Sequence, residues 1–255
     1  MTKRLIGKTA IITGATSGIG RGIALKMAEE GAFVCVVGRD RERALAVVDE
    51  ITKAGGEGSG YLCDITNPEE VKRMVDDVGR NKSRIDILVN AAGISPRGTV
   101  TGTSFEEFEA VMSVDLYSIF HFAKEVLPYM EEAGSGTIIN IVGTYGMRPV
   151  PNKAGYACAK AAALSLTRSI AIDYARKGIR CNAVSPGYVD TPLNEGFEGE
   201  RRDAFLEKYQ PMEGMIDAGD IADAAVFLAT DDSRFIMGQN LVVDGGTEAC
   251  LYYLH

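Results

Sequence analysis

The chain has 255 residues, of which 46% are hydrophobic, and its 35 acidic residues outnumber 27 basic ones to give a net charge of −8. This size and composition fit one α/β domain over residues 1–255, and the acidic balance without a basic cluster argues against nucleic acid or an anionic membrane as a partner. Because no segment near residue 1 is apolar enough for a signal peptide or a spanning helix, we expect a cytoplasmic protein.

Short β-branched segments alternate with helix-length segments along the chain. Continuous apolar strands separated by helices are typical of a parallel sheet covered on both faces, so the pattern predicts a doubly wound α/β fold with a seven-stranded parallel sheet. The expected strands are Thr9–Thr13, Phe33–Val37, Gly60–Cys63, Ile85–Val89, Thr137–Val142, Arg180–Val184 and Asn240–Val243. The expected helices are Gly20–Glu30, Arg41–Ala54, Glu69–Val78, Phe105–Glu132, Gly155–Lys177 and Asp220–Ala229.

The first expected strand leads directly into a glycine-rich loop, and a helix follows. Glycine allows a tight turn and a close approach to a diphosphate, and the free N–H groups of the new helix favour the anion. The loop lacks the Gly-Lys-Ser/Thr ending of a nucleotide-hydrolysing P-loop, so we predict a bound dinucleotide, with a phosphate-free turn as the alternative. The expected contacts are Gly14, Thr16, Ser17, Gly18, Ile19 and Gly20.

The end of the second strand indicates which dinucleotide is bound. An acidic residue there binds the ribose 2′-hydroxyl of NAD, whereas arginine suits the 2′-phosphate of NADP. Gly38 occupies the position expected for the acid and Arg39 follows it. NADP(H) is therefore the preferred cofactor, while Asp40 leaves NAD(H) possible. A solvated residue in a charged loop is the alternative role for Arg39.

The next two strands also end in residues that suit a ligand site, because ligands of open α/β sheets bind at the carboxyl edge. Asp64, followed by Ile65, can accept a hydrogen bond from an adenine amino group. Asn90, followed by Ala91 and by Gly93, is expected to stabilise the sheet edge beneath the cofactor. A turn or cap is the alternative role for Asp64 and for Asn90.

Tyr156 and Lys160 stand four residues apart in an expected helix, which places them on one face, one turn apart. A nearby ammonium group favours the phenolate and pulls the tyrosine pKa toward the range of a proton-transfer catalyst. Alone, such a pair is usually an ordinary surface pair.

Taken together, these motifs resemble the short-chain dehydrogenase/reductase family, from Lys8 to about Gly246. The resemblance implies a Rossmann domain, a nicotinamide cofactor and reversible hydride transfer between an alcohol and a carbonyl. It also implies a homotetramer, or less often a homodimer, with contacts through the long helices. The motifs that carry it are Thr13-Gly14-x-x-x-Gly18-Ile19-Gly20, Asn90-Ala91-Ala92-Gly93, Tyr156-x-x-x-Lys160 and Pro186-Gly187-x-x-x-Thr191.

By this resemblance Tyr156 is the general acid/base, and Lys160 holds the nicotinamide ribose and lowers the Tyr156 pKa. A lid over the substrate corresponds to about 192–210. The resemblance also implies cofactor contacts after the sixth strand, at Pro186, Gly187, Val189 and Thr191.

The first departure from the family pattern is Gly143, thirteen residues before Tyr156, where the family has a catalytic serine. Losing one such donor typically costs about 10²–10³ in rate. Thr144 is the nearest replacement, but successive strand side chains face opposite ways, so it can serve only if Gly143 lets the backbone turn. Otherwise the substrate or water takes over, or activity is lost.

The second departure is Asp115, where the family has an asparagine that holds a water linking Lys160 to solvent. An ionised carboxylate near Lys160 raises the lysine pKa and partly cancels its effect on Tyr156. We therefore expect Asp115 to move the pH optimum upward. A helix-surface carboxylate is the alternative.

The substrate is indicated only by the residues that flank the sheet edge and the lid. Together they suit a compact alicyclic, polyol or other hydroxylated substrate better than a long acyl carrier, with a generic apolar wall as the alternative. The apolar tail 247–255 is expected to pack Leu251, Tyr252 and Tyr253 against a neighbouring subunit. The expected pocket residues are Arg97, Tyr145, Met147, Tyr188, Leu193 and Phe197.

The predicted function is NAD(P)-dependent interconversion of a secondary alcohol and a ketone. A catalytically impaired dinucleotide-binding sensor or scaffold stays open because of Gly143, and lyase or epimerase chemistry is a third reading. No metal site or Ser-His-Asp triad is expected, because the five cysteines lack a C-x-x-C spacing and only His121 and His255 supply imidazoles.

Overall fold

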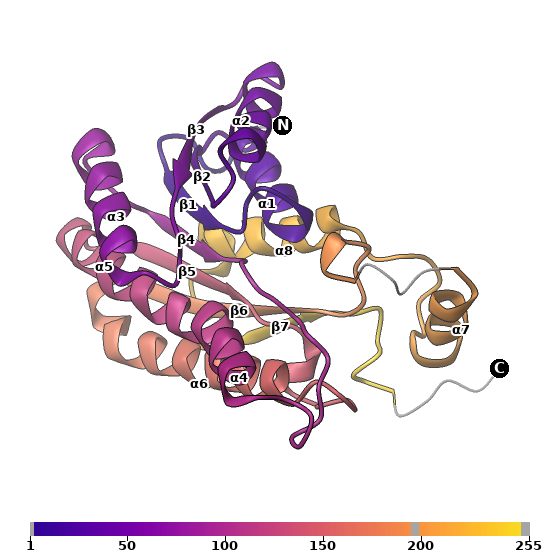
Figure 1. Ribbon diagram of the computed structural model, residues 1–255. Coiled ribbons are helices and arrows are strands. Elements are labelled where there is room, and N and C mark those ends of the chain that lie inside the picture. The colour runs from indigo at the N-terminus through magenta and orange to yellow at the C-terminus, as the bar shows by residue number, and fades with distance from the viewer. Residues whose placement is uncertain (1–2, 195–198, 251–255) are drawn as a thin grey trace.

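The computed structural model describes residues 3–194 and 199–250, and at its centre is a sheet of seven parallel strands (Figure 1). The sheet order is β3-β2-β1-β4-β5-β6-β7, so the chain changes direction across the sheet between β1 and β4. The predicted seven-stranded parallel sheet is confirmed. The strands are β1 (Thr9–Thr13), β2 (Phe33–Gly38), β3 (Glu57–Leu62), β4 (Ile87–Asn90), β5 (Gly136–Ile141), β6 (Ile179–Pro186) and β7 (Asn240–Val243).

Helices cover both faces of the sheet. Alternate side chains of each strand enter opposite cores: Ile12 packs in the same core as Ile23, and Ile11 in the same core as Phe122. Both faces are therefore buried, which explains why the strands are continuously apolar. One core contains α1 (Gly18–Glu29), α2 (Arg41–Lys53) and α8 (Ala218–Ala229), and the other contains α3 (Pro68–Lys82), α5 (Ser118–Ala133) and α6 (Ala154–Tyr174).

Several helices begin at side chains that cap their free N–H groups. Asp40 accepts a hydrogen bond from the backbone N–H of Arg43 at the start of α2. Ser104 and Glu107 form a capping box at the start of α4 (Phe105–Met112). These caps fix where the chain leaves each loop at the carboxyl edge of the sheet.

The helix expected over Phe105–Glu132 is not one regular helix. It contains α4 and α5, separated by a π-helical segment at Ser113–Tyr117. A π-helical insertion adds a residue to one turn and often marks a functional site. Here the insertion carries Asp115.

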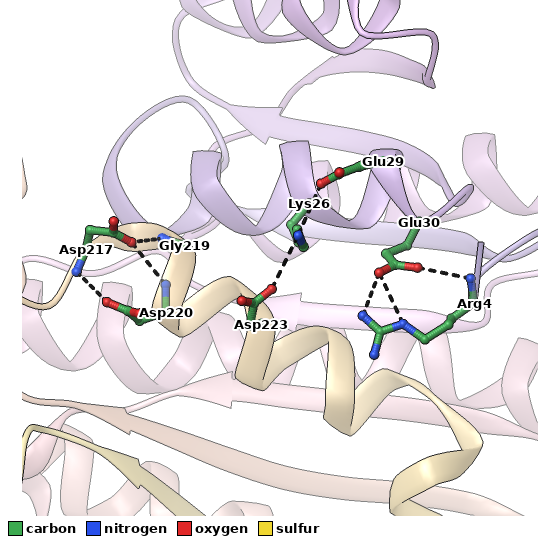
Figure 2. Close-up of polar contacts among 8 residues, drawn as sticks. All are labelled: Arg4, Lys26, Glu29, Glu30, Asp217, Gly219, Asp220 and Asp223. Carbon is green, nitrogen blue, oxygen red and sulfur yellow. Dashed lines mark hydrogen bonds and ion pairs between the residues drawn. The ribbon is translucent and has the colours of Figure 1, made fainter. Parts of the chain in front are cut away.

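Helices α1 and α8 pack closely, and Figure 2 shows the polar contacts at this pair. Lys26 Nζ lies 3.5 Å from Asp223 of α8, and a Cβ atom at Gly22 would approach α8 to 2.8 Å. Asp217 and Asp220 form the capping box that begins α8. The contacts with α8 hold α1 in place, next to the loop that follows β1.

The remaining differences lie near the substrate side and the tail. Part of the expected lid is a helix, α7 (Gly199–Tyr209), which the sequence pattern did not predict. The pocket role predicted for Phe197 and the subunit contact predicted for Leu251, Tyr252 and Tyr253 fall on residues outside the described ranges. Within the described ranges, no helix is both long and apolar enough to span a membrane.

Candidate active site

A cavity of about 1430 Å³ opens at the carboxyl edge of the sheet. It exceeds the roughly 300–1000 Å³ of a typical small-molecule site, as a dinucleotide and a second molecule require. All the expected cofactor contacts line it except Asn90. Among the expected substrate contacts, Tyr145, Tyr188 and Leu193 line it, whereas Arg97 does not.

At two positions where the chain passes from β1 into α1, the neighbouring backbone leaves no room for a Cβ atom. A Cβ atom at Gly14, whose φ is +65°, would lie 2.7 Å from Ala92 Cα, and one at Gly20 would overlap the carbonyl of Gly14. Ser17 is the N-cap of α1, but its side chain makes no capping hydrogen bond. The first N–H groups of α1 therefore remain available to an anion in the cavity, which fits a diphosphate.

At the end of β2, a side chain on residue 38 would require Thr16 to move. A Cβ atom at Gly38 would overlap Thr16 Cγ2. Asp40 already accepts a hydrogen bond at the start of α2, and it does not line the cavity. Arg39 lines the cavity together with Arg43, which we did not assign to the site, although it follows Arg39 by only four residues.

The polar residues after β3 and β4 have different surroundings. Asp64 lies on the cavity wall and accepts hydrogen bonds from Thr66, which lower the pKa of its carboxyl. Asn90 is buried and donates to Asn140 Oδ1 at 2.8 Å, so it joins β4 to β5 and does not face the cavity, unlike the other residues predicted to bind the cofactor. Asn140 in turn donates to Thr167 of α6 at 2.8 Å. This buried polar chain was not predicted, because it joins distant segments.

Tyr156 and Lys160 lie one turn apart on α6, and both line the cavity. Tyr156 Oη donates to the carbonyl of Val142 at 3.3 Å, and Lys160 Nζ donates to that of Ile141 at 3.1 Å. The Lys160 ammonium lies 5.6 Å from the centre of the Tyr156 ring. Both side chains are therefore held against the end of β5.

The net pKa shift of Tyr156 is opposite to the one we expected. Burial raises the pKa of Tyr156 above its ordinary value, and the charges of Asp115 and Tyr145 add to this increase, whereas Lys160 lowers it. The lysine acts in the predicted direction, but burial outweighs it. An acidified phenol is therefore not a property of this chain by itself.

Asp115 is not the surface carboxylate considered above, because its side chain is fully buried. Oδ1 lies 3.0 Å from Lys160 Nζ, and Oδ2 accepts a hydrogen bond from the backbone N–H of Ile94 at 3.0 Å. Burial alone lowers the pKa of Lys160, but Asp115 and Tyr156 outweigh burial and raise it overall. Lys160 is therefore held in its charged form by a buried partner.

Gly143 occupies the position where a side chain would face the phenol. A Cβ atom there would lie 3.2 Å from Tyr156 Oη, and the φ of +98° is one that glycine favours. The backbone therefore turns at Gly143, as a role for Thr144 required. Thr144 is buried and lines the cavity, and its hydroxyl makes no hydrogen bond to another described residue.

The substrate end of the cavity is largely aromatic. The rings of Tyr145 and Tyr156 meet edge to face at 6.4 Å, and Tyr188 lies 6.4 Å from Phe205 of α7. Met147, which we expected here, is exposed and does not line the cavity. Lys153 was missed: it donates to the carbonyl and to Oγ of Ser95, which lines the cavity.

Comparisons with known proteins cover almost the whole chain. A family model described as enoyl-(acyl carrier protein) reductase matches residues 14–248. A glucose 1-dehydrogenase from Gluconobacter oxydans is 37% identical, over 95% of this chain and 92% of the relative.

Two solved structures are similar in fold and in sequence. One is a gluconate 5-dehydrogenase from Burkholderia cenocepacia in complex with NADP and tartrate, with a TM-score of 0.93, 32% identity and coverage of 98% of each chain. The other is a 7α-hydroxysteroid dehydrogenase complexed with NADH and 7-oxo glycochenodeoxycholic acid, with a TM-score of 0.92, 36% identity and coverage of 96% of each chain.

Proposed function

The chain belongs to the short-chain dehydrogenase/reductase family, and from that premise we propose that it interconverts a secondary alcohol and a ketone with NADP(H). The substrate is a compact hydroxylated molecule. The observation that carries the proposal is the pair of Tyr156 and Lys160 on one face of α6, lining the cavity beside the glycine-rich loop.

The residues that would hold the cofactor lie along one side of the cavity. The loop from Gly14 to Gly20 and the start of α1 suit the diphosphate, and Asp64 suits the adenine amino group. When bound, the nicotinamide supplies or accepts the hydride. Lys160 would bind the ribose next to it.

The proton is moved by the chain itself. In the reductive direction Tyr156 gives its hydroxyl proton to the carbonyl oxygen, and in the oxidative direction it takes the proton back. Lys160 stabilises the phenolate that remains. Thr144 supplies the hydroxyl donor that Gly143 lacks, and the support for this role is its position in the cavity next to the turn at Gly143.

NADP(H) is preferred to NAD(H) because Arg39 and Arg43 line the cavity, whereas residue 38 is a glycine and supplies no carboxylate to a ribose. Two guanidinium groups suit a 2′-phosphate. The gluconate 5-dehydrogenase contains NADP, whereas the hydroxysteroid dehydrogenase contains NADH, so relatives alone do not decide the preference.

The protein is a homotetramer, or alternatively a homodimer, in the cytoplasm. Support comes from an open apolar groove formed by α5 and α6 with the preceding π-helical segment, where Phe120 is 52% exposed. Sedimentation would test the oligomer, and a monomer at micromolar concentration would contradict it.

The main test is a panel of alcohols and carbonyl compounds, with turnover followed at the nicotinamide absorbance. We expect turnover of at least one hydroxylated substrate, with a higher kcat/KM for NADP(H) than for NAD(H). Tight cofactor binding without turnover of any compound would instead favour the impaired binding protein that Gly143 suggested.

A further inference from the structure

We propose that the substrate carries a carboxylate group and that Arg97 and Lys153, which lie beside the substrate end of the cavity rather than in its lining, bind this group. The inference rests on the proposed function, because it names the substrate class of that same site. Neither residue takes part in the proton transfer described above.

Lys153 lies close to the catalytic tyrosine. It is the N-cap of α6, and its Nζ lies 6.0 Å from the centre of the Tyr156 ring. The partly buried ammonium donates to the carbonyl and to Oγ of Ser95, a residue of the cavity wall. An ammonium group has three N–H donors, so one remains after these two neutral contacts.

Arg97 places a second positive charge at the same end. Its side chain is exposed, and the neighbouring Gly98 pairs with Lys153 and donates its backbone N–H to the carbonyl of Asn152 at 3.0 Å. Burial raises the pKa of Tyr145, and the charge of Arg97 opposes that increase. Burial contributes first to the lowered pKa of Lys153, and the like charge of Arg97 adds to it. The pairing of Gly98 with Lys153 therefore places Arg97 next to the segment that carries Lys153.

The two cations have no acidic partner within the described ranges. No carboxylate there lies within 4.0 Å of either side chain, although acidic residues outnumber basic ones in the chain by 35 to 27. Arg148, a third cation at this end, is paired with Glu248 at 3.4 Å. Two neighbouring cations without a counter-charge at the edge of an active site are typical of an anion site.

The donors and the distance favour a carboxylate on a small molecule. The planar guanidinium of Arg97 can bind the two oxygens of a carboxylate, and the remaining N–H of Lys153 can bind one of them. Because Lys153 Nζ is 6.0 Å from the Tyr156 ring, the anion would be only a few bonds from the reacting carbon. A hydroxy acid or sugar acid fits this arrangement.

Matched acids and amides test the proposal. The binding of gluconate, tartrate and glycerate to the complex of the protein with NADPH, which cannot accept a hydride from them, would be measured by calorimetry, beside the binding of gluconamide, tartramide and glyceramide. We expect at least one acid to bind more tightly than its amide, by about tenfold or more. Arg97→Gln should remove that difference while leaving amide binding within about twofold.

Two further variants separate a direct contact from a general effect. Arg176→Gln removes an exposed arginine from η3 (Ala175–Lys177), away from the cavity lining, and should preserve the difference between acid and amide. Lys153→Gln should weaken acid binding by about tenfold. Since Lys153 also holds Ser95, Arg97→Gln is the decisive variant.

Sorbitol 6-phosphate is added to the panel as a phosphate probe. Three results would overturn the proposal: equal binding of every acid and its amide, an acid affinity unchanged in Arg97→Gln, or a loss of affinity in Arg97→Gln for sorbitol 6-phosphate alone. The last result would assign the pair to a phosphate. Turnover of neutral alcohols is measured separately, so failure of the carboxylate site is distinguishable from failure of the proposed oxidoreductase activity.

Discussion

The two ends of the cavity are built in different ways. The cofactor end depends on backbone shape, because Gly14, Gly20 and Gly38 leave no room for a side chain. The catalytic end depends on charge, because Lys160 and Asp115 form a buried ion pair behind Tyr156. A site made from backbone changes little with pH, whereas each substitution in a buried charge pair alters the pKa of its neighbours.

Replacing Tyr156 with phenylalanine should separate the two ends most strongly. The phenol transfers the proton, so kcat should fall by about 10²–10⁴. The cofactor end remains intact, so the Kd for NADPH, measured by fluorescence titration, should change by no more than about threefold. A variant that retains turnover within about tenfold would remove Tyr156 from the mechanism.

Thr144→Val tests whether the catalytic end has a substitute for the missing serine. If the Thr144 hydroxyl donates to the substrate oxygen, kcat should fall by about 10²–10³, whereas Thr144→Ser should lose much less. Equal rates for the valine and serine variants would show that the hydroxyl is not the donor. Circular dichroism of both variants provides the folding control.

Asp115→Asn tests the charge at the catalytic end through pH. Asp115 raises the pKa of Tyr156, so the neutral amide should lower it. Alcohol oxidation needs the phenolate, so its rate increases as the pH rises through this pKa. The rising limb of kcat/KM against pH should therefore move to lower pH.

Superimposable pH profiles of the parent and Asp115→Asn would contradict this account. The free energy of unfolding should be measured for the same variant. Removing one partner of a buried ion pair typically lowers the free energy of unfolding by about 3–5 kcal/mol. The pH profile of kcat/KM is therefore compared only under conditions in which the variant is folded.

Arg39→Gln gives the smallest expected effect, and it acts at the cofactor end. Loss of a charged hydrogen bond to the 2′-phosphate should reduce the preference for NADPH over NADH by about tenfold. Arg41 is a matched control, because it is exposed and does not line the cavity. Equal shifts in Arg39→Gln and Arg41→Gln would indicate a general charge effect.

Sequence reasoning predicted the cofactor end better than the catalytic end for a physical reason. Strands buried on both faces require continuous apolar segments, and the glycines of a tight loop adjoin those strands in the chain. The burial of Asp115 instead depends on Lys160, which a different helix supplies. The π-helical insertion that carries Asp115 leaves no clear periodic signal in a segment of five residues.

Lys153 and Arg43 show a related difficulty. Each looks like an ordinary charged residue in the sequence, and only the folded arrangement places it near the cavity. The contact between Tyr188 and Phe205 of α7 also joins separate segments, which no local pattern specifies.

The contact between Gly38 and Thr16 makes the evolution of cofactor choice depend on the order of mutations. Gly38→Asp alone would drive its Cβ into the Thr16 methyl group, so a first step toward an acidic ribose contact requires Thr16 to move. Thr16→Ser removes that methyl while keeping a hydroxyl at the loop. The two substitutions are therefore epistatic, and the less costly order is serine first.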